Sequence, residues 1–212
     1  MHKNTFQEET WQGEFGNQYI QRNPTSPEEA EKAYLKYYGV LRSDLNQEFL
    51  GELDRSINIL EVGANIGIQL ALLQKMGFKN LYGVEINRGA IEFSKAHLKD
   101  IDIIKASALD IPFKDNYFNL VFTSGVLIHI APSDLKKSME EIYRCANEYI
   151  WGFEPFAENY TEVVYRGNKN LHWKGNYPQM YLDAFKDLKL IKEKNIKYLE
   201  NENINKMFLL KK

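Results

Sequence analysis

One segment, residues 57–67, restricts the possible folds of this chain more than any other; it reads Ile-Asn-Ile-Leu-Glu-Val-Gly-Ala-Asn-Ile-Gly. The β-branched run at 57–62 predicts a buried strand. Gly63 and Gly67 predict a tight turn directly after it, and the apolar run from about 68 to 76 predicts a helix. Strand, glycine turn and helix form the first half of a βαβ unit, whose bare backbone at the carboxyl edge of a parallel sheet can approach a nucleotide-like ligand.

The rest of the chain alternates strand and helix patterns. Further strands are predicted at 80–87, 101–105, 117–123 and 148–154, helices at 88–98, 132–145 and 177–185, and a terminal hairpin pair at 188–197 and 204–210. This order predicts an α/β fold with a doubly wound, mostly parallel sheet of seven strands and right-handed crossovers. The lysines after residue 186 are interpreted as the solvated faces of the last strands.

The residues before the sheet predict a helical cap. Ser26 suits an N-cap, Pro27 the first helical position and Glu29 a capping box, so a helix is expected from there to about residue 45. A shorter helical piece is expected at 47–53. We therefore expect an N-terminal helical arm and cap over 1–54, and a core over 55–212 with an insertion at about 155–175.

The aromatic segment 5–23 has two interpretations. Its aromatic side chains recur at roughly helical spacing, although Gly13 and Gly16 weaken a continuous helix. The segment either packs on the sheet domain, or forms a lid that supplies Tyr19 and Glu14 to a ligand pocket.

Composition limits the kinds of partner. The chain has 27 basic and 29 acidic side chains, a net charge of -2, which is no electrostatic footprint for nucleic acid or an anionic membrane. No apolar run approaches the ~20 residues of a membrane helix, and the polar start shows no signal peptide, so a cytoplasmic protein is expected. A lone Cys145, on one face of a predicted helix, excludes an intramolecular disulfide and a cysteine zinc site; no metal site is expected.

Glu85 indicates which kind of ligand the glycine turn could bind. It ends the second predicted strand 22 positions after Gly63, a separation at which a carboxylate meets the ribose hydroxyls of a ligand lying over the turn. A dinucleotide site needs the pattern G-x-G-x-x-G, but Asn65 and Ile68 occupy the second and third glycine positions. The residues therefore favour a nucleoside ligand without phosphates.

The motif Glu61-x-Gly63-x-x-x-Gly67, followed by Glu85, resembles the class I S-adenosylmethionine-dependent methyltransferases. Two later segments, 107–113 and 117–121, resemble the family's adenine segment and fourth strand. The resemblance implies that the cofactor lies against residues Glu61, Gly63, Ala64, Asn65, Gly67, Glu85, Ile86, Ser107, Ala108 and Thr123. Asn65, Ser107 and Asn119 depart from the usual pattern; Asn tolerates the left-handed backbone, and Ser107 stands where an aspartate often meets the adenine amine.

A narrower resemblance spans nearly the whole chain. The residues that carry it are Trp11-x-Gly13-Glu14-Phe15-Gly16-x-x-Tyr19-Ile20-x-Arg22-Asn23, Glu61-x-Gly63-Ala64-Asn65-Ile66-Gly67, Gly125 to Ile130, and Tyr165-Arg166-Gly167. They resemble the methylases associated with pseudaminic and legionaminic acid biosynthesis, sugars that decorate bacterial flagella and surface glycans. The resemblance implies a nonulosonic sugar acceptor, free or CMP-activated.

His129 is the candidate general base, because it follows the fourth strand at the carboxyl edge and its ordinary pKa suits proton transfer near neutrality. Its alternative role is structural, packed between Ile128 and Ile130. The segment 155–175 is a candidate acceptor loop. Within this segment, Arg166 could bind a sugar carboxylate or phosphate, and Tyr160 and Tyr165 could stack on a sugar ring. Glu154, just before the segment, could bind a cationic amidine or take up a proton. The alternative is that the segment is an ordinary surface loop.

These observations predict a methyltransferase that uses S-adenosylmethionine, with methylation on nitrogen favoured over oxygen. The alternatives are an O-methyltransferase of another small molecule, a non-catalytic binding protein with this fold, and a nicotinamide oxidoreductase. The missing glycines at 65 and 68 disfavour the last. The net charge counts against a nucleic-acid substrate.

Overall fold

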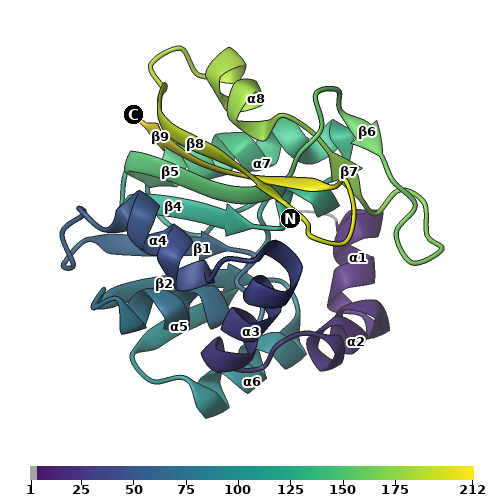
Figure 1. The fold of residues 1–212 in the computed structure, drawn as a ribbon, viewed down its shortest axis with the longest axis horizontal. Helices are drawn as coiled ribbons and strands as arrows, with labels where there is room; N and C mark the ends of the chain where they lie inside the picture. The colour runs from purple at the N-terminus through teal and green to yellow at the C-terminus, as the bar shows by residue number, and fades with distance from the viewer. Residues whose placement is uncertain (1–3) are drawn as a thin grey trace.

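The computed structural model describes residues 4–212 (Figure 1). The helices are α1 (Phe6–Gln12), α2 (Glu14–Arg22), α3 (Pro27–Tyr38), α4 (Arg42–Leu50), α5 (Ile68–Lys75), α6 (Arg88–His97), the 3₁₀ turn η1 (Leu127–His129), α7 (Pro132–Cys145) and α8 (Tyr177–Ala184). The strands are β1 (Asn58–Val62), β2 (Asn80–Glu85), β3 (Ile101–Lys105), β4 (Phe118–Ser124), β5 (Ala146–Pro155), β6 (Thr161–Glu162), β7 (Trp173–Lys174), β8 (Lys189–Lys197) and β9 (Ile204–Lys211).

The main sheet has seven strands in the order β3-β2-β1-β4-β5-β9-β8. The first five are parallel, and β9 runs antiparallel to both β5 and β8. The predicted doubly wound, mostly parallel α/β sheet is confirmed. Because Val62 pairs with Val84 and Glu85 with Lys105, the loops that follow β1, β2 and β3 emerge side by side at one edge.

Alternate residues of the central strands feed two cores, one on each face of the sheet. Ile59 lies in a cluster with side chains of α4, α5 and α6, whereas Leu60 lies in a second cluster with side chains of α7 and α8. Figure 1 shows these helix sets on opposite sides of the sheet. A strand buried on both faces needs a continuous apolar run, which explains the Ile-rich pattern that predicted β1.

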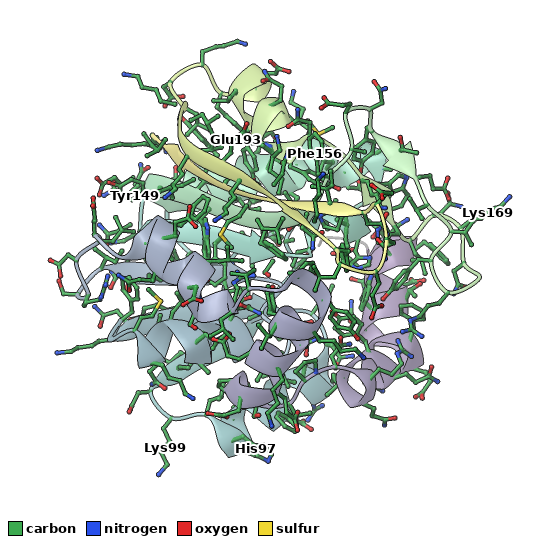
Figure 2. The ribbon with its side chains drawn as sticks, in the orientation of Figure 1. His97, Lys99, Tyr149, Phe156, Lys169 and Glu193 are labelled. Atoms are coloured by element: carbon green, nitrogen blue, oxygen red, sulfur yellow. The ribbon has the colours of Figure 1, made fainter. Side chains whose placement is uncertain are left out.

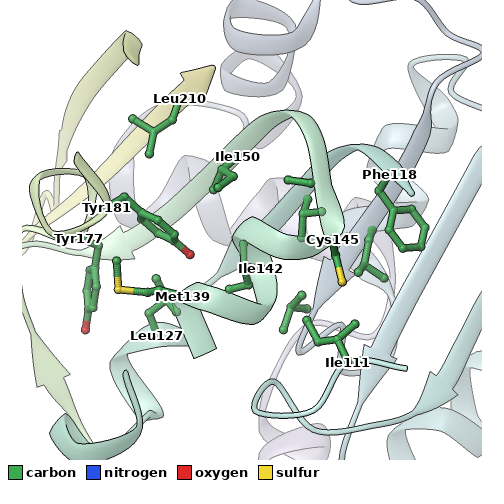
Figure 3. Packing of buried hydrophobic residues seen from close by; sticks show 14 of the residues in the cluster. Ile111, Phe118, Leu127, Met139, Ile142, Cys145, Ile150, Tyr177, Tyr181 and Leu210 are labelled. Carbon is green, nitrogen blue, oxygen red and sulfur yellow. The ribbon is translucent and has the colours of Figure 1, made fainter. Parts of the chain in front are cut away.

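Cys145 lies in the second core, at the end of α7 (Figure 3). The thiol is buried, and burial raises its pKa to about 11. At physiological pH it is therefore protonated and packed among neighbours such as Ile142 and Phe118, which is typical of a packing role and not of a nucleophile.

The N-terminal helices differ from the prediction in where they break. The expected helix from residue 27 to 45 is wrong: α3 ends at Tyr38, because Gly39 adopts the left-handed conformation (φ 70°). The expected piece at 47–53 is only in part helical, because α4 runs from Arg42 to Leu50 and residues 51–53 form a turn. The capping box is also shifted, since Glu29 Oε2 accepts from the Thr25 N–H, while Ser26 Oγ accepts from the Glu29 N–H.

The aromatic segment 5–23 forms two helices, α1 and α2, which we call the arm. Thr5 and Glu8 form a capping box at its start, and the arm turns at Gly13. Figure 1 places α1 beside the segment that holds β6 and β7. Gln7 Nε2 donates to the Asn170 carbonyl at 2.9 Å, so the arm touches the 155–175 segment directly.

Strand β8 is one margin of the sheet. Its exposed side chains include Lys189, Lys194 and Lys197, and Lys194 Nζ lies 2.6 Å from a Glu48 carboxylate oxygen. Figure 2 shows the side chains over the whole molecule, with Glu193 of this strand labelled. Within residues 4–212, no helix is both long and apolar enough to span a bilayer.

Candidate functional site

A cavity of about 600 Å³ lies at the carboxyl edge of the parallel strands. This volume falls within the range of about 300–1,000 Å³ that is usual for small-ligand sites. The arm, α3, the loops after β1, β2, β3 and β4, and the 155–175 segment all line it. The glycine turn and the arm therefore both form part of its wall.

The turn after β1 holds its shape through left-handed residues. Gly63 and Gly67 have φ values of 71° and 82°, and Asn65 has a φ of 49°, so the expected tolerance of Asn for this conformation is realised. A Cβ on Gly63 would lie 2.6 Å from Val126 Cγ2. A side chain at position 63 would thus both strain the backbone and collide with the loop after β4.

Glu85 is buried and is held by three backbone N–H groups. Oε1 accepts from Ile86 at 2.8 Å and from Asn87 at 2.7 Å, while Oε2 accepts from Asn65 at 2.7 Å. Burial raises the pKa of Glu85, and these bonds oppose the rise. A carboxylate has about four acceptor positions, so one remains on Oε2 for a ligand hydroxyl. A second ribose bond requires the Asn65 N–H to release Oε2.

Glu61 faces the same cavity, with a buried cation near it. Arg42, from α4, is fully buried; it donates to the Tyr34 hydroxyl at 2.6 Å and to Asn46 Oδ1 at 2.8 Å. Burial raises the pKa of Glu61, and the Arg42 charge opposes that rise. Among residues 4–212, Glu61 Oε2 and Arg42 Nη2 find no hydrogen-bond partner. Glu61 therefore offers an acceptor suited to an ammonium group.

The loop after β3 meets the arm. The Ser107 hydroxyl donates to Glu8 Oε1 and accepts from the Leu109 N–H at 2.9 Å. Asn87 Nδ2 donates to the Trp11 carbonyl at 3.0 Å, and the arm packs close to it at Gly16, where a Cβ would lie 2.8 Å from that nitrogen. The arm is thus joined to the loops that follow β2 and β3.

Glu154, at the end of β5, anchors the loop after β4. Its Oε1 accepts from the N–H groups of Val126 at 3.0 Å and Leu127 at 3.3 Å, and Thr123 contributes a side-chain hydrogen bond. Burial raises the pKa of Glu154 to about 7, and these bonds oppose the rise. Glu154 therefore fixes the start of η1, the turn whose last residue is His129.

His129 lines the cavity, and a hydrogen bond to a backbone carbonyl determines its tautomer. Its Nδ1 is 2.7 Å from the Leu171 carbonyl oxygen, which can only accept, so Nδ1 carries the hydrogen. Burial lowers the pKa of His129 to about 3, and the nearby His172 lowers it further. The imidazole is therefore neutral at physiological pH, with a lone pair on Nε2.

The depressed pKa of His129 predicts a pH-dependent stability. The unfolded chain binds more protons than the native one between about pH 3 and 6.5, so the stability that this residue contributes is present above pH 6.5 and is lost as the pH falls. We expect a cost of roughly 2 kcal/mol at pH 5. His129→Phe removes this term, so its free energy of unfolding should fall less than that of the wild type between pH 7 and pH 5, by urea denaturation.

The matched control for this experiment is His97→Phe, an exposed histidine at the end of α6. Glu154 changes the free energy of unfolding in the opposite direction as the pH falls. Its folded pKa of about 7 lets the native state bind more protons than the unfolded chain between pH 4.5 and 7. Both variants retain Glu154, so their difference isolates His129. Parallel pH dependence in His129→Phe and wild type would contradict a depressed pKa.

Aromatic rings surround His129. The Trp11 ring centroid lies 4.4 Å from that of His129, and the centroids of Tyr165 and His172 both lie at 5.5 Å. Tyr19 packs on Trp11 at 5.2 Å. All five line the cavity, and in the described chain neither ring nitrogen of His172 has a hydrogen-bond partner. We call these five residues the aromatic chamber.

The cavity brings most of the predicted site residues together. Those that line it are Glu61, Gly63, Ala64, Asn65, Glu85, Ile86, Ser107, Ala108, His129, Tyr19 and Tyr165. Gly67, Thr123, Glu154 and Tyr160 stand behind its wall: a Cβ on Gly67 would meet Leu98, and the Tyr160 hydroxyl donates to the Ile130 carbonyl. Glu14 is exposed and accepts from Gln18, and Arg166 is exposed at the tip of the 165–168 turn.

Three residues of the site had no role in the sequence-based prediction. Glu8 lines the cavity, Arg42 lies near Glu61, and Asn87, which caps α6, also binds the arm. The spacing of Thr5 and Glu8 is a capping-box signal that locates α1. Nothing local in the sequence signals Arg42, because its partners come from α3, α4 and β4.

Comparison with known proteins adds a family match to this geometry. Residues 60–148 match the model of a methyltransferase domain. An uncharacterised protein of Haemophilus influenzae is 25% identical over 100 residues, which cover 44% of this chain and only 40% of that protein. The match therefore spans less than half of that relative.

Two solved structures share the fold. A 1,6-didemethyltoxoflavin-N1-methyltransferase from Burkholderia thailandensis, solved with 1,6-didemethyltoxoflavin and S-adenosylhomocysteine, has a TM-score of 0.63 at 12% identity, covering 80% of this chain and 76% of that one. A SAM-dependent methyltransferase from Methanosarcina mazei has a TM-score of 0.62 at 15% identity, covering 76% and 95%. At these identities the likeness concerns the fold.

Proposed function

We propose that this S-adenosylmethionine-dependent methyltransferase methylates a nitrogen atom of a small, sugar-derived acceptor. The cofactor rests on the methyltransferase-domain match and on the sheet that carries it. The acceptor class, a nonulosonic acid of the pseudaminic or legionaminic type, free or CMP-activated, rests on the resemblance of residues 11–23, 125–130 and 165–167. Such a role belongs to bacterial flagellar and surface-glycan biosynthesis, in the cytoplasm.

The residues of the cavity fit this cofactor. The Gly63 backbone gives close access beside the unpaired Oε2 of Glu61, which suits the ammonium group of a methionine moiety. The open position on Glu85 suits a ribose hydroxyl. When bound, S-adenosylmethionine supplies an electrophilic methyl group. The protein then has to place the acceptor in line with it and manage one proton.

The observation that carries the acceptor proposal is the neutral His129 inside the aromatic chamber. A histidine whose pKa is lowered to about 3 is a weak base, poorly suited to deprotonate a sugar hydroxyl. It suits a nitrogen acceptor, because an N–H group becomes strongly acidic as the methyl group arrives. Nε2 accepts that N–H, orients the nitrogen lone pair and receives the proton, while Leu171 holds the ring.

The chamber also suits the body of a sugar. Flat faces of Trp11, Tyr19 and Tyr165 pack against the apolar side of a pyranose ring, and His172 offers ring nitrogens to its hydroxyl groups. Asp134, in the first turn of α7, lines the cavity as well and is a carboxylate that can bind a cationic amidine.

The direct test incubates the full chain with methyl-labelled S-adenosylmethionine and a panel of free and CMP-activated nonulosonic acids. We expect label in at least one sugar, and NMR of the product should place the methyl group on nitrogen. A methyl group on oxygen would overturn the choice of atom. Label in a protein or RNA fraction, with none in the sugars, would overturn the acceptor class. Cofactor binding without any transfer would favour a non-catalytic binding protein.

Arg166 provides a test of acceptor recognition. Its guanidinium stands exposed beside the Tyr165 ring, at the edge of the chamber, and we propose that it pairs with the acceptor carboxylate. Arg166→Ala should raise the KM for an acidic sugar by roughly 10-fold, because charge-assisted hydrogen bonds contribute on the order of 1.5–3 kcal/mol. The cofactor Kd should not change.

Lys169→Ala is the matched control, since Lys169 carries the same charge on the same segment and points away from the molecule (Figure 2). Steady-state kinetics with one acceptor and its carboxyl-reduced or esterified analogue separates charge from shape. Equal KM values for Arg166→Ala and Lys169→Ala would exclude a role of Arg166 in acceptor binding.

A further inference from the structure

A second group of aromatic side chains lines the cavity beside β5 and β9. Tyr34 and Tyr38 come from α3, Phe153 from β5 and Tyr198 from the turn between β8 and β9, and neighbouring ring centroids in the group lie between 4.6 and 5.9 Å apart. Asn205, near the start of β9, binds the hydroxyl groups of Tyr38 and Tyr198. All five residues line the cavity, and we call them the tyrosine pocket.

Asn205 presents a hydrogen-bond acceptor that has no partner. The residue is only 3% exposed; its Nδ2 donates to the Tyr38 hydroxyl at 2.8 Å and to the Tyr198 hydroxyl at 3.5 Å. Within residues 4–212, its Oδ1 accepts no hydrogen bond, which is unfavourable for a buried carbonyl. Because the Tyr198 oxygen accepts from the amide, its hydrogen is left for a ligand carbonyl. The pocket therefore suits a ligand group that carries one donor and one acceptor.

The charge beside the pocket indicates that this ligand group is neutral. Arg42 is fully buried, and its guanidinium carbon lies 4.8 Å from the Phe153 ring centroid and 5.4 Å from that of Tyr34. A second cation against these rings would meet a like charge. A carboxylate or a phosphate dianion, in turn, has no hydrogen to donate to Asn205 Oδ1.

The tyrosine pocket lies next to the aromatic chamber and apart from the proposed cofactor contacts. Those contacts follow β1, β2 and β3, whereas β5 and β9 lie on the other side of β4 in the sheet. Tyr19 of the chamber is close enough to both Tyr34 and Tyr165 for their hydroxyl groups to interact electrostatically. An acceptor held at His129 can therefore extend past Tyr19 into the tyrosine pocket.

We infer that the tyrosine pocket binds an acylamino group of the acceptor. Asn205 Oδ1 accepts the amide N–H, the Tyr198 hydroxyl donates to the acyl carbonyl, and the aromatic rings pack on the acyl methyl group. The inference rests on the proposed acceptor class and narrows it to sugar acids with an N-acyl group besides the nitrogen that is methylated. A hydroxyl group at this place satisfies Asn205 but leaves the aromatic walls unfilled, and an ammonium group meets the charge of Arg42.

Three sugar acids that differ at one carbon test this inference. The methyl glycosides of N-acetylneuraminic acid, of its analogue with a hydroxyl in place of the acetamido group, and of neuraminic acid carry a neutral amide, a hydroxyl and an ammonium group there. Calorimetric titration with saturating S-adenosylhomocysteine keeps the cofactor site filled. The wild type should bind the acetamido glycoside at least 10-fold more tightly than the other two. In saturation-transfer NMR, its acetyl methyl protons should receive the strongest saturation.

Two variants separate a ligand contact from a structural role. Asn205→Leu keeps a side chain of similar size and removes the acceptor, so the preference for the acetamido glycoside should fall to near unity. Tyr198→Phe removes one hydroxyl from a half-buried ring and should lower the preference roughly 3-fold, which decides the inference if Asn205→Leu fails to fold. Asn195→Leu is the matched control, because Asn195 is exposed on β8 of the same hairpin; it should keep the wild-type preference.

The ratio of the affinities for the three glycosides decides the inference. If the wild type binds all three equally, or if both pocket variants keep its preference, the tyrosine pocket does not contact an acyl group and the inference is wrong, while a sugar acid remains the proposed acceptor. If the wild type binds none of the three, the proposed acceptor class fails and the inference fails with it. Because no methyl transfer is measured, the choice between nitrogen and oxygen as the methylated atom does not affect the predicted ratio.

Discussion

Glu85→Ala should weaken the binding of S-adenosylmethionine by roughly 100-fold. The substitution removes the carboxylate that we propose as the ribose acceptor, and it also releases the Asn65 N–H, which fixes the middle of the glycine turn. Hydrogen bonds to a charged group contribute on the order of 1.5–3 kcal/mol each, and the loss of one or two gives this factor. Calorimetric titration with S-adenosylmethionine and S-adenosylhomocysteine measures it.

Two controls distinguish a loss of cofactor binding in Glu85→Ala from a general effect of charge or folding. Glu92→Ala removes an exposed carboxylate of α6, which pairs with Arg88, and should leave the cofactor Kd unchanged. Circular dichroism should show that Glu85→Ala retains the wild-type secondary structure, because the freed N–H groups of residues 65, 86 and 87 become accessible to water. A folded variant with wild-type affinity would remove Glu85 from the cofactor site.

His129→Phe should lower kcat by roughly 10²–10³-fold, the range typical for the loss of a positioned proton acceptor. The substitution keeps a ring between Trp11 and Tyr165 but removes Nε2, the atom that we propose orients the acceptor and receives its proton. The Kd for S-adenosylmethionine should not change, since the cofactor contacts that we propose lie on the loops after β1, β2 and β3. Single-turnover methyl transfer with a saturating acceptor measures the chemical step directly.

His172→Phe is the companion variant, because it alters a second imidazole of the aromatic chamber without removing the one that Leu171 orients. We expect it to raise the acceptor KM more than it lowers kcat. Unchanged turnover in His129→Phe would assign His129 to packing and would point to a nitrogen acceptor that loses its proton directly to water.

The sequence predicted the parts of the fold that depend on local patterns. The apolar run of β1, the N-cap of α3 at Ser26 and the strand at 101–105 are encoded in consecutive residues, and they occur where they were expected. The Gly39 break was missed because Tyr37 and Leu41 continue a helical spacing across it. The left-handed preference of glycine outweighs that spacing.

The candidate site shows the same difference between contacts that follow from sheet topology and contacts that depend on tertiary packing. Gly63, Asn65 and Glu85 belong to loops that follow adjacent strands, so their meeting follows from sheet topology alone. The contact of Glu8 with Ser107 depends on how the arm packs against the loops of the sheet. Tertiary packing decides such contacts, and no periodicity in the sequence records them.

The burial of Arg42 likewise required the structure. A pattern of apolar and charged residues places an arginine at the surface, yet here aromatic rings of Trp151 and Phe153 lie within 5.1 Å of the guanidinium carbon. The cation is retained inside because Tyr34 and Asn46 bind it and the Glu61 carboxyl lies nearby.

The lysines of the edge strand β8 affect how two copies of the protein can approach each other. Strand β8 exposes backbone groups that could template a further strand from another copy. Two copies that approach in antiparallel fashion along this margin bring Lys189 of one chain towards Lys197 of the other, while the two lysines between them, Lys192 and Lys194, share the single carboxylate of Glu48. Mutual repulsion thus counteracts the adhesion of the exposed Leu190 and Ile191, and protects the open edge against fibrillar stacking.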